Sequence, residues 1–209
     1  MKTILVVNAK GGCGKTTLST NLASYFATNE FNTVLVDFDP QQSALEWLKE
    51  RNKDYYYEIQ GVSPFQKRLR FAADVERVVL DAPARVEGKQ LADLVRRADI
   101  ILVPVLPSPI DMRAAATFIK ELLLTGHAEE KKIAVVANRV RENTLIYRQL
   151  NKFLKQLKIP FLASIRDSQN YIHVAEAGLG IFDMPWYLVS HDIEQWKPLV
   201  RWINRNLDD

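Results

Sequence analysis

The sequence predicts an α/β fold, in which a mainly parallel, twisted β-sheet is flanked by helices on both faces. Two observations predict it. Short continuous runs of β-branched and aliphatic residues recur along the chain, as is typical of strands covered on both sides. Segments with helical spacing of apolar residues separate these runs, which indicates parallel strands joined by crossover helices. The chain has 209 residues, of which 47% are hydrophobic, so we expect residues 1–209 to form a single domain.

The strands are predicted directly from the apolar runs. Five runs are clear and a sixth is shorter: ILVVN (4–8), TVLVDFD (33–39), RVVLDAP (77–83), IILVPV (100–105), KIAVVANR (132–139) and PFLAS (160–164). Aspartate and proline residues fall just after several of these strands. In open α/β sheets that edge is where ligands bind.

Helices are expected in the segments between and after the strands, because apolar residues there follow a helical period. The expected ranges are about 15–29, 41–52, 88–97, 111–126, 143–157, 168–177 and 190–206. Segment 54–74 is the least regular part of the chain. We interpret its three consecutive tyrosines, Tyr55 to Tyr57, as an aromatic strand packed in the core rather than a base-stacking cluster.

Composition excludes several classes of protein. No run of about 18 apolar residues exists and the N-terminus does not have the pattern of a secretory signal, so we expect a cytoplasmic protein. The single cysteine, Cys13, excludes an internal disulfide framework and a cysteine-cluster metal site built from one chain. The three histidines are too scattered to suggest metal ligation, and the net charge of +3 says little about partners.

A glycine-rich loop, KGGCGKTT, follows the first predicted strand and leads into the first predicted helix. Its three glycines allow the backbone to turn N–H groups inward, and the N-terminus of the helix adds a favourable field for phosphate. The glycines are Gly11, Gly12 and Gly14. Strand, loop and helix in this order predict a P-loop NTPase.

The side chains of this loop have distinct expected roles in binding a nucleotide. Lys15 is placed to bridge the β- and γ-phosphates, and Thr16 to offer its hydroxyl to Mg²⁺. Thr17 is placed to contact a nearer phosphate. Cys13 occupies a variable position where only its backbone N–H is expected to matter. The loop carries one further lysine, Lys10, which phosphate binding by the loop itself does not require.

Carboxylates follow two of the predicted strands. Phosphoryl transfer depends on positioning and charge stabilisation, so a nucleotide enzyme needs an acid for Mg²⁺ and a polar group for the attacking water. Asp81 is the natural Walker B acid, and Asp39 is our choice for orienting the water. Asp37 is expected to anchor the Mg²⁺ water shell or Lys15. The alternative is that these acids are ordinary turn residues at strand ends.

Taken together, these residues resemble the ParA/MinD group of deviant Walker ATPases over nearly the whole chain. The group's loop K-G-G-x-G-K-T-[TS] is matched at residues 10–17, and its D-x-D-P-Q signature at 37–41. Further agreement lies in LDAPA (80–84), PVLPSPID (104–111), VVANR (135–139), IRDS (165–168) and EAGLGIFD (176–183). LDAPA departs from the commoner double-proline version of the Walker B tail.

The resemblance implies an ATPase that uses ATP and Mg²⁺ and works as a homodimer. Lys10 would reach across a nucleotide sandwich to the phosphates bound by the partner subunit, and would therefore act in catalysis. Asn138 is similar to the adenine-contacting asparagine of the group, or is a turn residue at the end of its strand. The short chain resembles small ParA-type proteins, which partition plasmids or position chromosome origins and large cytoplasmic cargoes. An adaptor linked to the cargo would stimulate hydrolysis.

A basic helix offers a surface for DNA. Between Arg139 and Arg166 there are seven basic residues and one acid. In segment 143–157 the apolar residues form one stripe, while Arg148, Lys152 and Lys155 fall on the other side. Such a face attracts a phosphate backbone without reading bases, which is what association with the nucleoid requires. An ordinary solvated helix face is the alternative.

The C-terminal helix at 190–206 offers a competing surface. Its apolar face is accompanied by basic residues spaced by four, among them Arg201 and Arg205, which could share the DNA contacts. The same pattern is similar to the membrane-targeting tail of MinD-type proteins, so a membrane-surface ATPase is the alternative function. Pro198 within the helix and two aspartates at its end disfavour a lipid contact. We therefore expect a helix packed on the core.

Overall fold

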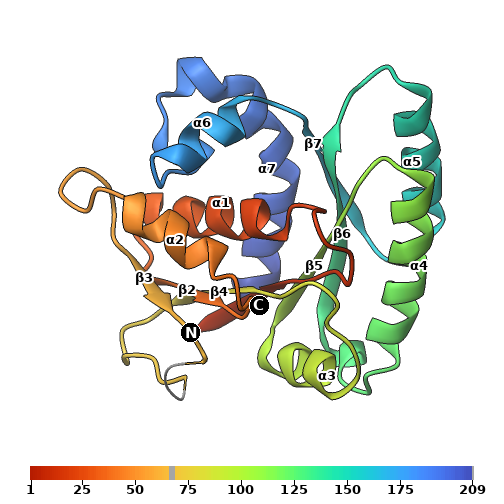
Figure 1. The fold of residues 1–209 in the computed structure, drawn as a ribbon, viewed down its shortest axis with the longest axis horizontal. Coiled ribbons are helices and arrows are strands. Elements are labelled where there is room, and N and C mark those ends of the chain that lie inside the picture. The colour runs from red at the N-terminus through yellow and green to blue at the C-terminus, as the bar shows by residue number, and fades with distance from the viewer. Residues whose placement is uncertain (66–68, 209) are drawn as a thin grey trace.

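The computed structural model describes residues 1–65 and 69–208, whose centre is a seven-stranded sheet (Figure 1). The strand order is β3-β2-β4-β1-β5-β6-β7, and all neighbouring strands run parallel. The strands are β1 (Lys2–Val6), β2 (Thr33–Asp37), β3 (Ile59–Val62), β4 (Arg77–Asp81), β5 (Ile100–Val105), β6 (Lys132–Val140) and β7 (Phe161–Arg166). Parallel strands place all their carboxyl ends at one edge, where the loops that follow them meet.

Helices cover both faces of this sheet (Figure 1). They are α1 (Lys15–Thr28), α2 (Ser43–Glu50), α3 (Gly88–Arg97), α4 (Pro109–Leu123), α5 (Leu145–Gln156), α6 (Asn170–Glu176) and α7 (Trp186–Asp208), with 3₁₀ turns at Ala128–Glu130 and Ile181–Asp183. Helices α1, α2, α6 and α7 bury their apolar side chains in one core, and α3, α4 and α5 in a second core. The predicted fold class is confirmed.

The two cores explain why the strands have continuous apolar runs. Successive side chains of a strand point to opposite faces of the sheet. In β1, Ile4 and Val6 therefore pack under α1 and α7, whereas Leu5 packs toward α3 and α4. All three side chains are fully buried, so neither face of the strand tolerates a polar residue.

The ends of several elements differ from their predicted positions. Strands β2 and β4 each end two residues earlier than expected, at Asp37 and Asp81, so Asp39 lies in the turn after β2. Helix α7 begins at Trp186 rather than at residue 190 and continues through Pro198. The earlier start brings three exposed apolar side chains, Trp186, Tyr187 and Leu188, into the first turn of this helix.

Segment 54–74, in which the apolar residues follow no regular spacing, contains the edge strand β3. This strand has only four residues, and Gln60 and Gly61 interrupt its apolar character. The interpretation of the three tyrosines as a strand in the core is wrong, because they lie in an irregular segment before β3. Tyr55 is 81% exposed and Tyr57 is 51% exposed. Only Tyr56 packs partly against the core.

Candidate nucleotide-binding site

The loop between β1 and α1 wraps around the N-terminal end of α1. Gly12 and Gly14 have φ values of +75° and +90°, in the left-handed region that favours glycine. A Cβ at position 14 would also lie 2.0 Å from Nδ2 of Asn138, so glycine is required there for two reasons. The backbone N–H of Leu18 donates to the carbonyl of Gly14 at 3.0 Å, so the helix starts directly at the loop. Its first turn therefore points backbone N–H groups at the site, which favours an anion.

The two lysines of the loop are in different situations. Lys15 is buried, and its Nζ donates to the carbonyl oxygen of Lys10 at 3.1 Å. Lys10 is exposed, and within residues 1–65 and 69–208 its ammonium group makes no hydrogen bond or ion pair. Its backbone is fixed by Asn8, whose Oδ1 accepts from the Lys10 N–H at 3.1 Å and whose Nδ2 donates to the carbonyl of Pro104. Asn8 was not predicted as a site residue from the sequence. Its position at the end of the first strand is the signal that could have indicated it.

Asp81 lies beneath the start of α1, as expected of a Walker B acid. Its Oδ2 accepts a hydrogen bond from the Thr16 hydroxyl at 2.8 Å, and its Oδ1 accepts from the Ser19 hydroxyl at 2.9 Å. Burial raises the pKa of this carboxyl to about 7, and the charge of Asp37 adds to the rise, against the lowering effect of the two hydroxyls and Lys15. Ser19 was missed by the sequence analysis. It lies one helical turn after Thr16 and so shares the face that meets Asp81.

Asp37 holds the backbone of the turn that carries Asp39. Its Oδ1 accepts from the Asp39 N–H at 2.9 Å, while its Oδ2 accepts from the N–H groups of Ala44 and Leu45 at the start of α2. Burial raises the pKa of the Asp37 carboxyl. Both of its oxygens therefore serve the turn and α2, and Lys15 donates to the loop carbonyl instead of to Asp37.

Several adjoining hollows open at this edge of the sheet, and the two largest of them share lining residues. The larger, of about 560 Å³, is lined by the phosphate loop together with Asp39, Pro83 and Arg139, among others. The second, of about 420 Å³, is lined by side chains of β6, β7 and α6, among them Asn138 and Tyr171. Because Thr17 and Arg139 line both hollows, the two form one elongated site. The larger hollow is lined mainly by the phosphate loop, and Tyr171 contributes an aromatic ring to the second.

Asn138 joins the second hollow to the phosphate loop. Its Nδ2 donates to the carbonyl of Cys13 at 2.9 Å, and its Oδ1 accepts from the backbone N–H of Arg139. The Cys13 side chain is itself buried and its Sγ–H donates to the carbonyl of Lys10. Burial raises the pKa of this thiol. Cys13 therefore contributes a packed side chain as well as its backbone.

Arg139 is a site residue that the sequence analysis did not single out. Its φ of +50° is unusual for a residue with a side chain, and such strain is found preferentially at functional sites. The side chain is exposed, and in the described part of the chain its guanidinium group forms no hydrogen bond or ion pair. Its place directly after Asn138 is the signal that could have identified it.

The residues at the phosphate end fit a magnesium ion that is shared with a nucleotide. Within residues 1–65 and 69–208, no group of three or more His, Cys, Asp or Glu side chains could hold a metal alone. Mg²⁺ typically takes one or two protein oxygens and completes its shell with water and substrate phosphates. The hydroxyl of Thr16 and the carboxylate of Asp81 are a donor set of this kind.

The predicted DNA-binding residues lie on two separate helices. Arg148, Lys152 and Lys155 are exposed on α5, and Arg201 and Arg205 are exposed on α7. The apolar sides of these helices belong to different cores, so the two sets cover opposite faces of the sheet (Figure 1). A single flat contact from one chain would use one set or the other.

Part of the positive charge counted around α5 is compensated in three dimensions. Arg141 forms an ion pair with Asp167 at 2.8 Å, and Arg166 forms one with Asp192 at 2.6 Å. Both acids lie outside the segment from 139 to 166, so the sequence count overestimated its free charge. The three basic residues of α5 named above carry the remaining argument for a basic face.

No helix within residues 1–65 and 69–208 is long and apolar enough to cross a bilayer.

The fold and this site define the class of protein. Residues 4–181 match the sequence family described as the CobQ/CobB/MinD/ParA nucleotide binding domain, and the chain belongs to this family. The predicted resemblance to the ParA/MinD group is confirmed.

Particular relatives place the chain near the ParA-type members. It is 30% identical over 189 residues to maintenance of carboxysome distribution protein A of Halothiobacillus neapolitanus, covering 87% of each chain. The protein of the same name from Gloeobacter kilaueensis is 30% identical over 184 residues, covering 86% of this chain and 83% of that one. Over a shorter stretch of 62 residues, the chain is 42% identical to the chromosome-partitioning ATPase Soj of Thermus thermophilus, covering 29% of this chain and 25% of that one.

Solved structures share the fold at lower identity. The MinD cell division protein of Aquifex aeolicus matches with a TM-score of 0.71 and 16% identity, over 100% of this chain and 98% of that one. A plasmid partition protein of Borrelia burgdorferi bound to AMPPNP also matches with a TM-score of 0.71, at 17% identity over 96% and 98% of the two chains.

Proposed function

We propose that this chain is a ParA-type ATPase that dimerises with ATP, binds DNA without sequence preference and positions or partitions a cargo. The single observation that carries the proposal is the contrast between the two lysines of the phosphate loop. Lys15 is buried within the loop, whereas Lys10 is exposed at its rim and, among the described residues, unpaired. An exposed cation beside a phosphate site suits the phosphates of a nucleotide held by a second subunit.

The residues of the site divide the work of ATP hydrolysis. Lys15 exchanges its contact with the Lys10 carbonyl for the β- and γ-phosphates, which the N–H groups of the loop also bind. Thr16 and Asp81 would hold Mg²⁺, which neutralises charge on the phosphate oxygens when bound. Asp39, at the edge of the same hollow, orients the attacking water.

Two further residues support this arrangement. Asp37 fixes the turn that presents Asp39, and we assign it this positioning role together with any contact to the water shell of the metal. Asn138 lines the hollow that suits the base and also holds the Cys13 carbonyl, so one amide would link base binding to the shape of the phosphate loop.

DNA binding is assigned to the exposed basic residues of α5, namely Arg148, Lys152 and Lys155. They lie on one side of a helix whose Leu150 and Leu154 are buried, so they are held outward. Contacts of this kind neutralise phosphates and release counterions, which makes binding sensitive to salt. Arg201 and Arg205 on α7 are the alternative set.

The cargo is proposed from the relatives. The names of the similar proteins refer to carboxysome distribution and to chromosome or plasmid partition. We infer a plasmid, chromosome locus or large cytoplasmic body as the cargo, with action in the cytoplasm on the nucleoid. A cargo-linked adaptor protein would stimulate hydrolysis and release the chain from DNA.

The test is binding to random duplex DNA, measured by fluorescence anisotropy with ATP and with ADP over a range of salt concentrations. We expect binding with ATP alone, with affinity falling as salt rises. Changing Arg148, Lys152 and Lys155 together to alanine should weaken binding and make it less sensitive to salt. The slope of the logarithm of the binding constant against the logarithm of the salt concentration should become shallower by up to about one for each phosphate contact that is lost. The matched variant Arg201→Ala/Arg205→Ala should retain binding. Equal affinity with ATP and ADP would refute the proposal.

The alternative of a membrane-surface ATPase is less well supported by α7. Trp196, Leu199 and Ile203, which form the centre of its apolar side, are completely buried against the sheet and α1. A helix that binds lipid needs that side free. Vesicle flotation with ATP would test this alternative directly.

A further inference from the structure

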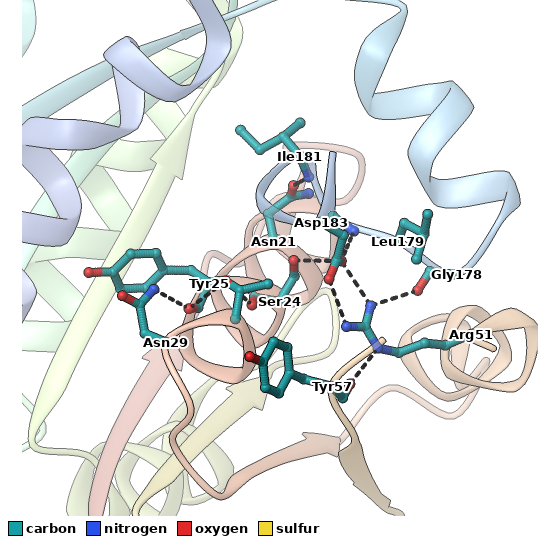
Figure 2. Close-up of polar contacts among 12 residues, drawn as sticks. Asn21, Ser24, Tyr25, Asn29, Arg51, Tyr57, Gly178, Leu179, Ile181 and Asp183 are labelled. Atoms are coloured by element: carbon teal, nitrogen blue, oxygen red, sulfur yellow. Dashed lines mark hydrogen bonds and ion pairs between the residues drawn. The ribbon is translucent and has the colours of Figure 1, made fainter. Parts of the chain in front are cut away.

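A buried ion pair outside the nucleotide site joins parts of the chain that are far apart in sequence (Figure 2). Arg51, which directly follows α2, donates from Nη1 and Nη2 to the two carboxylate oxygens of Asp183, each at 2.8 Å. The two side chains are 2% and 1% exposed. The loop between α6 and α7 is thereby attached to the C-terminal end of α2.

The remaining polar atoms of the pair are also satisfied. Arg51 donates from Nε to the carbonyl of Tyr57 at 2.9 Å, and from Nη1 to the carbonyl of Gly178 at 3.3 Å. Asp183 Oδ2 accepts from the Ser24 hydroxyl on α1 at 2.7 Å and from the N–H of Gly180 at 2.8 Å. Buried ion pairs are often no better for stability than apolar residues of similar volume. A network this complete therefore points to a role in fixing geometry.

Two glycines let the loop lie close to the end of α2 and to a side chain of α1. Gly178 has φ +67°, and a Cβ there would lie 2.2 Å from the backbone nitrogen of Arg51. A Cβ at Gly180 would lie 2.6 Å from the Ser24 hydroxyl oxygen. The loop is thus fitted against α2 and against α1, the helix that begins at Lys15 of the phosphate loop.

Helix α2 depends on such polar contacts because its apolar contact area is small. Only Ala44 and Trp47 are buried among its eight residues. At its N-terminal end, Asp37 accepts the N–H of Ala44, as described above. Toward its C-terminal end, Trp47 donates from Nε1 to the carbonyl of Leu179 at 3.1 Å, and Arg51 follows. The orientation of α2 is therefore set by polar anchors at both of its ends.

A change in the contact between Arg51 and Asp183 would shift the turn that carries Asp39, at the other end of α2. A helix of eight residues is about 12 Å long, so a tilt of about 10° about its middle moves each end by about 1 Å. The turn from Asp39 to Gln41 leads directly into α2 and lines the phosphate hollow. In an active site a misplacement of about 1 Å can cost about 100-fold in rate.

We propose that Arg51 is a positioning residue for Asp39. Paired with Asp183, it fixes the end of α2 opposite to Asp37, so that the Asp39 turn keeps its place beside the phosphate loop. This inference rests on the proposed ATPase function, in which Asp39 orients the attacking water.

Two variants of the full chain test this role, with one control on the same helix. Arg51→Lys keeps the charge but loses the planar fork that binds both oxygens of Asp183. Arg51→Met/Asp183→Asn removes both charges together and keeps an amide oxygen that can accept from Gly180 and Ser24. Lys49→Met is the control, because Lys49 forms only an exposed pair with Glu46 on α2.

The readouts are single-turnover ATP hydrolysis, the Kd for a fluorescent ATP analogue and a thermal melt. In both Arg51 variants we expect the hydrolysis rate to fall about tenfold or more while Kd changes less than about threefold, and we expect Lys49→Met to match the wild type. In an Asp39→Ala background, adding Arg51→Lys should change the residual rate by less than about twofold, because the two residues act through one step.

The possible outcomes distinguish the role of Arg51 from the proposed ATPase function. Wild-type hydrolysis rates in both folded variants, or losses that simply multiply with that of Asp39→Ala, would overturn the role of Arg51 and leave the proposed ATPase function standing. A wild-type chain that binds ATP without hydrolysing it would overturn the proposed function and this inference with it.

Discussion

Two regions of the molecule bury carboxylates, and they compensate the charge in different ways. At the nucleotide edge, Asp81 binds the hydroxyls of Thr16 and Ser19, and no lysine or arginine of the described chain forms an ion pair with it. Between α1, α2 and the loop before α7, Asp183 is held by both terminal nitrogens of Arg51. The first carboxylate forms no ion pair within the described residues, and we propose that Mg²⁺ bound with the nucleotide supplies its cation, whereas the second is paired with a cation of the chain itself.

The same difference appears in a second pair of acids. Burial raises the pKa of Asp37, which binds only backbone N–H groups. Burial also acts to raise the pKa of Asp192, but hydrogen bonds from Arg166 and Asn170 outweigh it and hold that pKa below its ordinary value. Asp37 therefore has no cation of the chain to compensate its burial, whereas Asp192 has one in Arg166.

The largest effect is expected where a built-in cation loses its partner. Asp183→Ala leaves the guanidinium of Arg51 buried and unpaired, so the free energy of unfolding should fall by about 3–5 kcal/mol. Urea denaturation followed by circular dichroism measures this. A loss below about 1 kcal/mol would mean that the pair is not the anchor described here.

The opposite sign is expected at the nucleotide edge. Asp81→Asn keeps the shape and an oxygen that accepts from one hydroxyl, and it removes a buried charge. Without nucleotide, the variant should be more stable than the wild type by about 1–3 kcal/mol at pH 7. The same urea experiment, repeated with Mg²⁺ and ATP, should show that the variant gains less stability from the nucleotide than the wild type does. A variant that is less stable without nucleotide would contradict this interpretation of Asp81.

The pH dependence of stability should separate the two regions. The pKa of Asp81 is raised to about 7 in the folded chain, so between about pH 4 and 7 the folded state binds more protons than the unfolded state. Without nucleotide, this carboxyl therefore makes the free energy of unfolding fall as pH rises through that window, and Asp81→Asn should flatten the slope. Asp192, with its lowered pKa, loses its contribution only as the pH falls below about 4. Identical slopes for the wild type and Asp81→Asn would count against the raised pKa.

The smallest effect is expected for an ion pair in contact with solvent. Arg141 and Asp167 form such a pair, with side chains 77% and 42% exposed. Asp167→Ala should lower the free energy of unfolding by no more than about 1 kcal/mol, because water screens both charges. It therefore serves as the matched control for Asp183→Ala in the same urea series.

Much of the fold and of the phosphate site could be predicted from the sequence because both depend on local patterns. Continuous apolar runs revealed the buried strands, and the loop from Lys10 to Thr17 carries its glycines and lysines within eight residues. The strand β3 escaped prediction because it has four residues at the sheet edge, with Gln60 and Gly61 inside it. Such a strand has neither a continuous apolar run nor a clear alternation.

The rest of the site depends on contacts between distant segments. Arg51 and Asp183 are 132 residues apart, and the local sequence around either residue does not predict that the two form an ion pair. The role of Asp37 shows a related limit. Its place at the end of a strand predicts a contact to the Mg²⁺ water shell or to Lys15, and the fold adds contacts from its oxygens to the backbone of the turn and of α2 that the sequence could not indicate. Only the three-dimensional arrangement distinguishes an acid that supports the site from one that lines it.

The central claim, that Lys10 makes dimerisation depend on the nucleotide, is tested most directly by mass. Light scattering would be recorded for Asp39→Ala, whose hydrolysis is expected to be blocked, and for Asp39→Ala/Lys10→Ala, each with ATP and with ADP. Binding of a fluorescent ATP analogue would confirm that both variants still take up nucleotide. We predict twice the 23.9 kDa of one chain for Asp39→Ala with ATP, and the mass of a single chain for the double variant and for both variants with ADP. A dimer of the double variant with ATP, or no dimer of Asp39→Ala, would contradict the account.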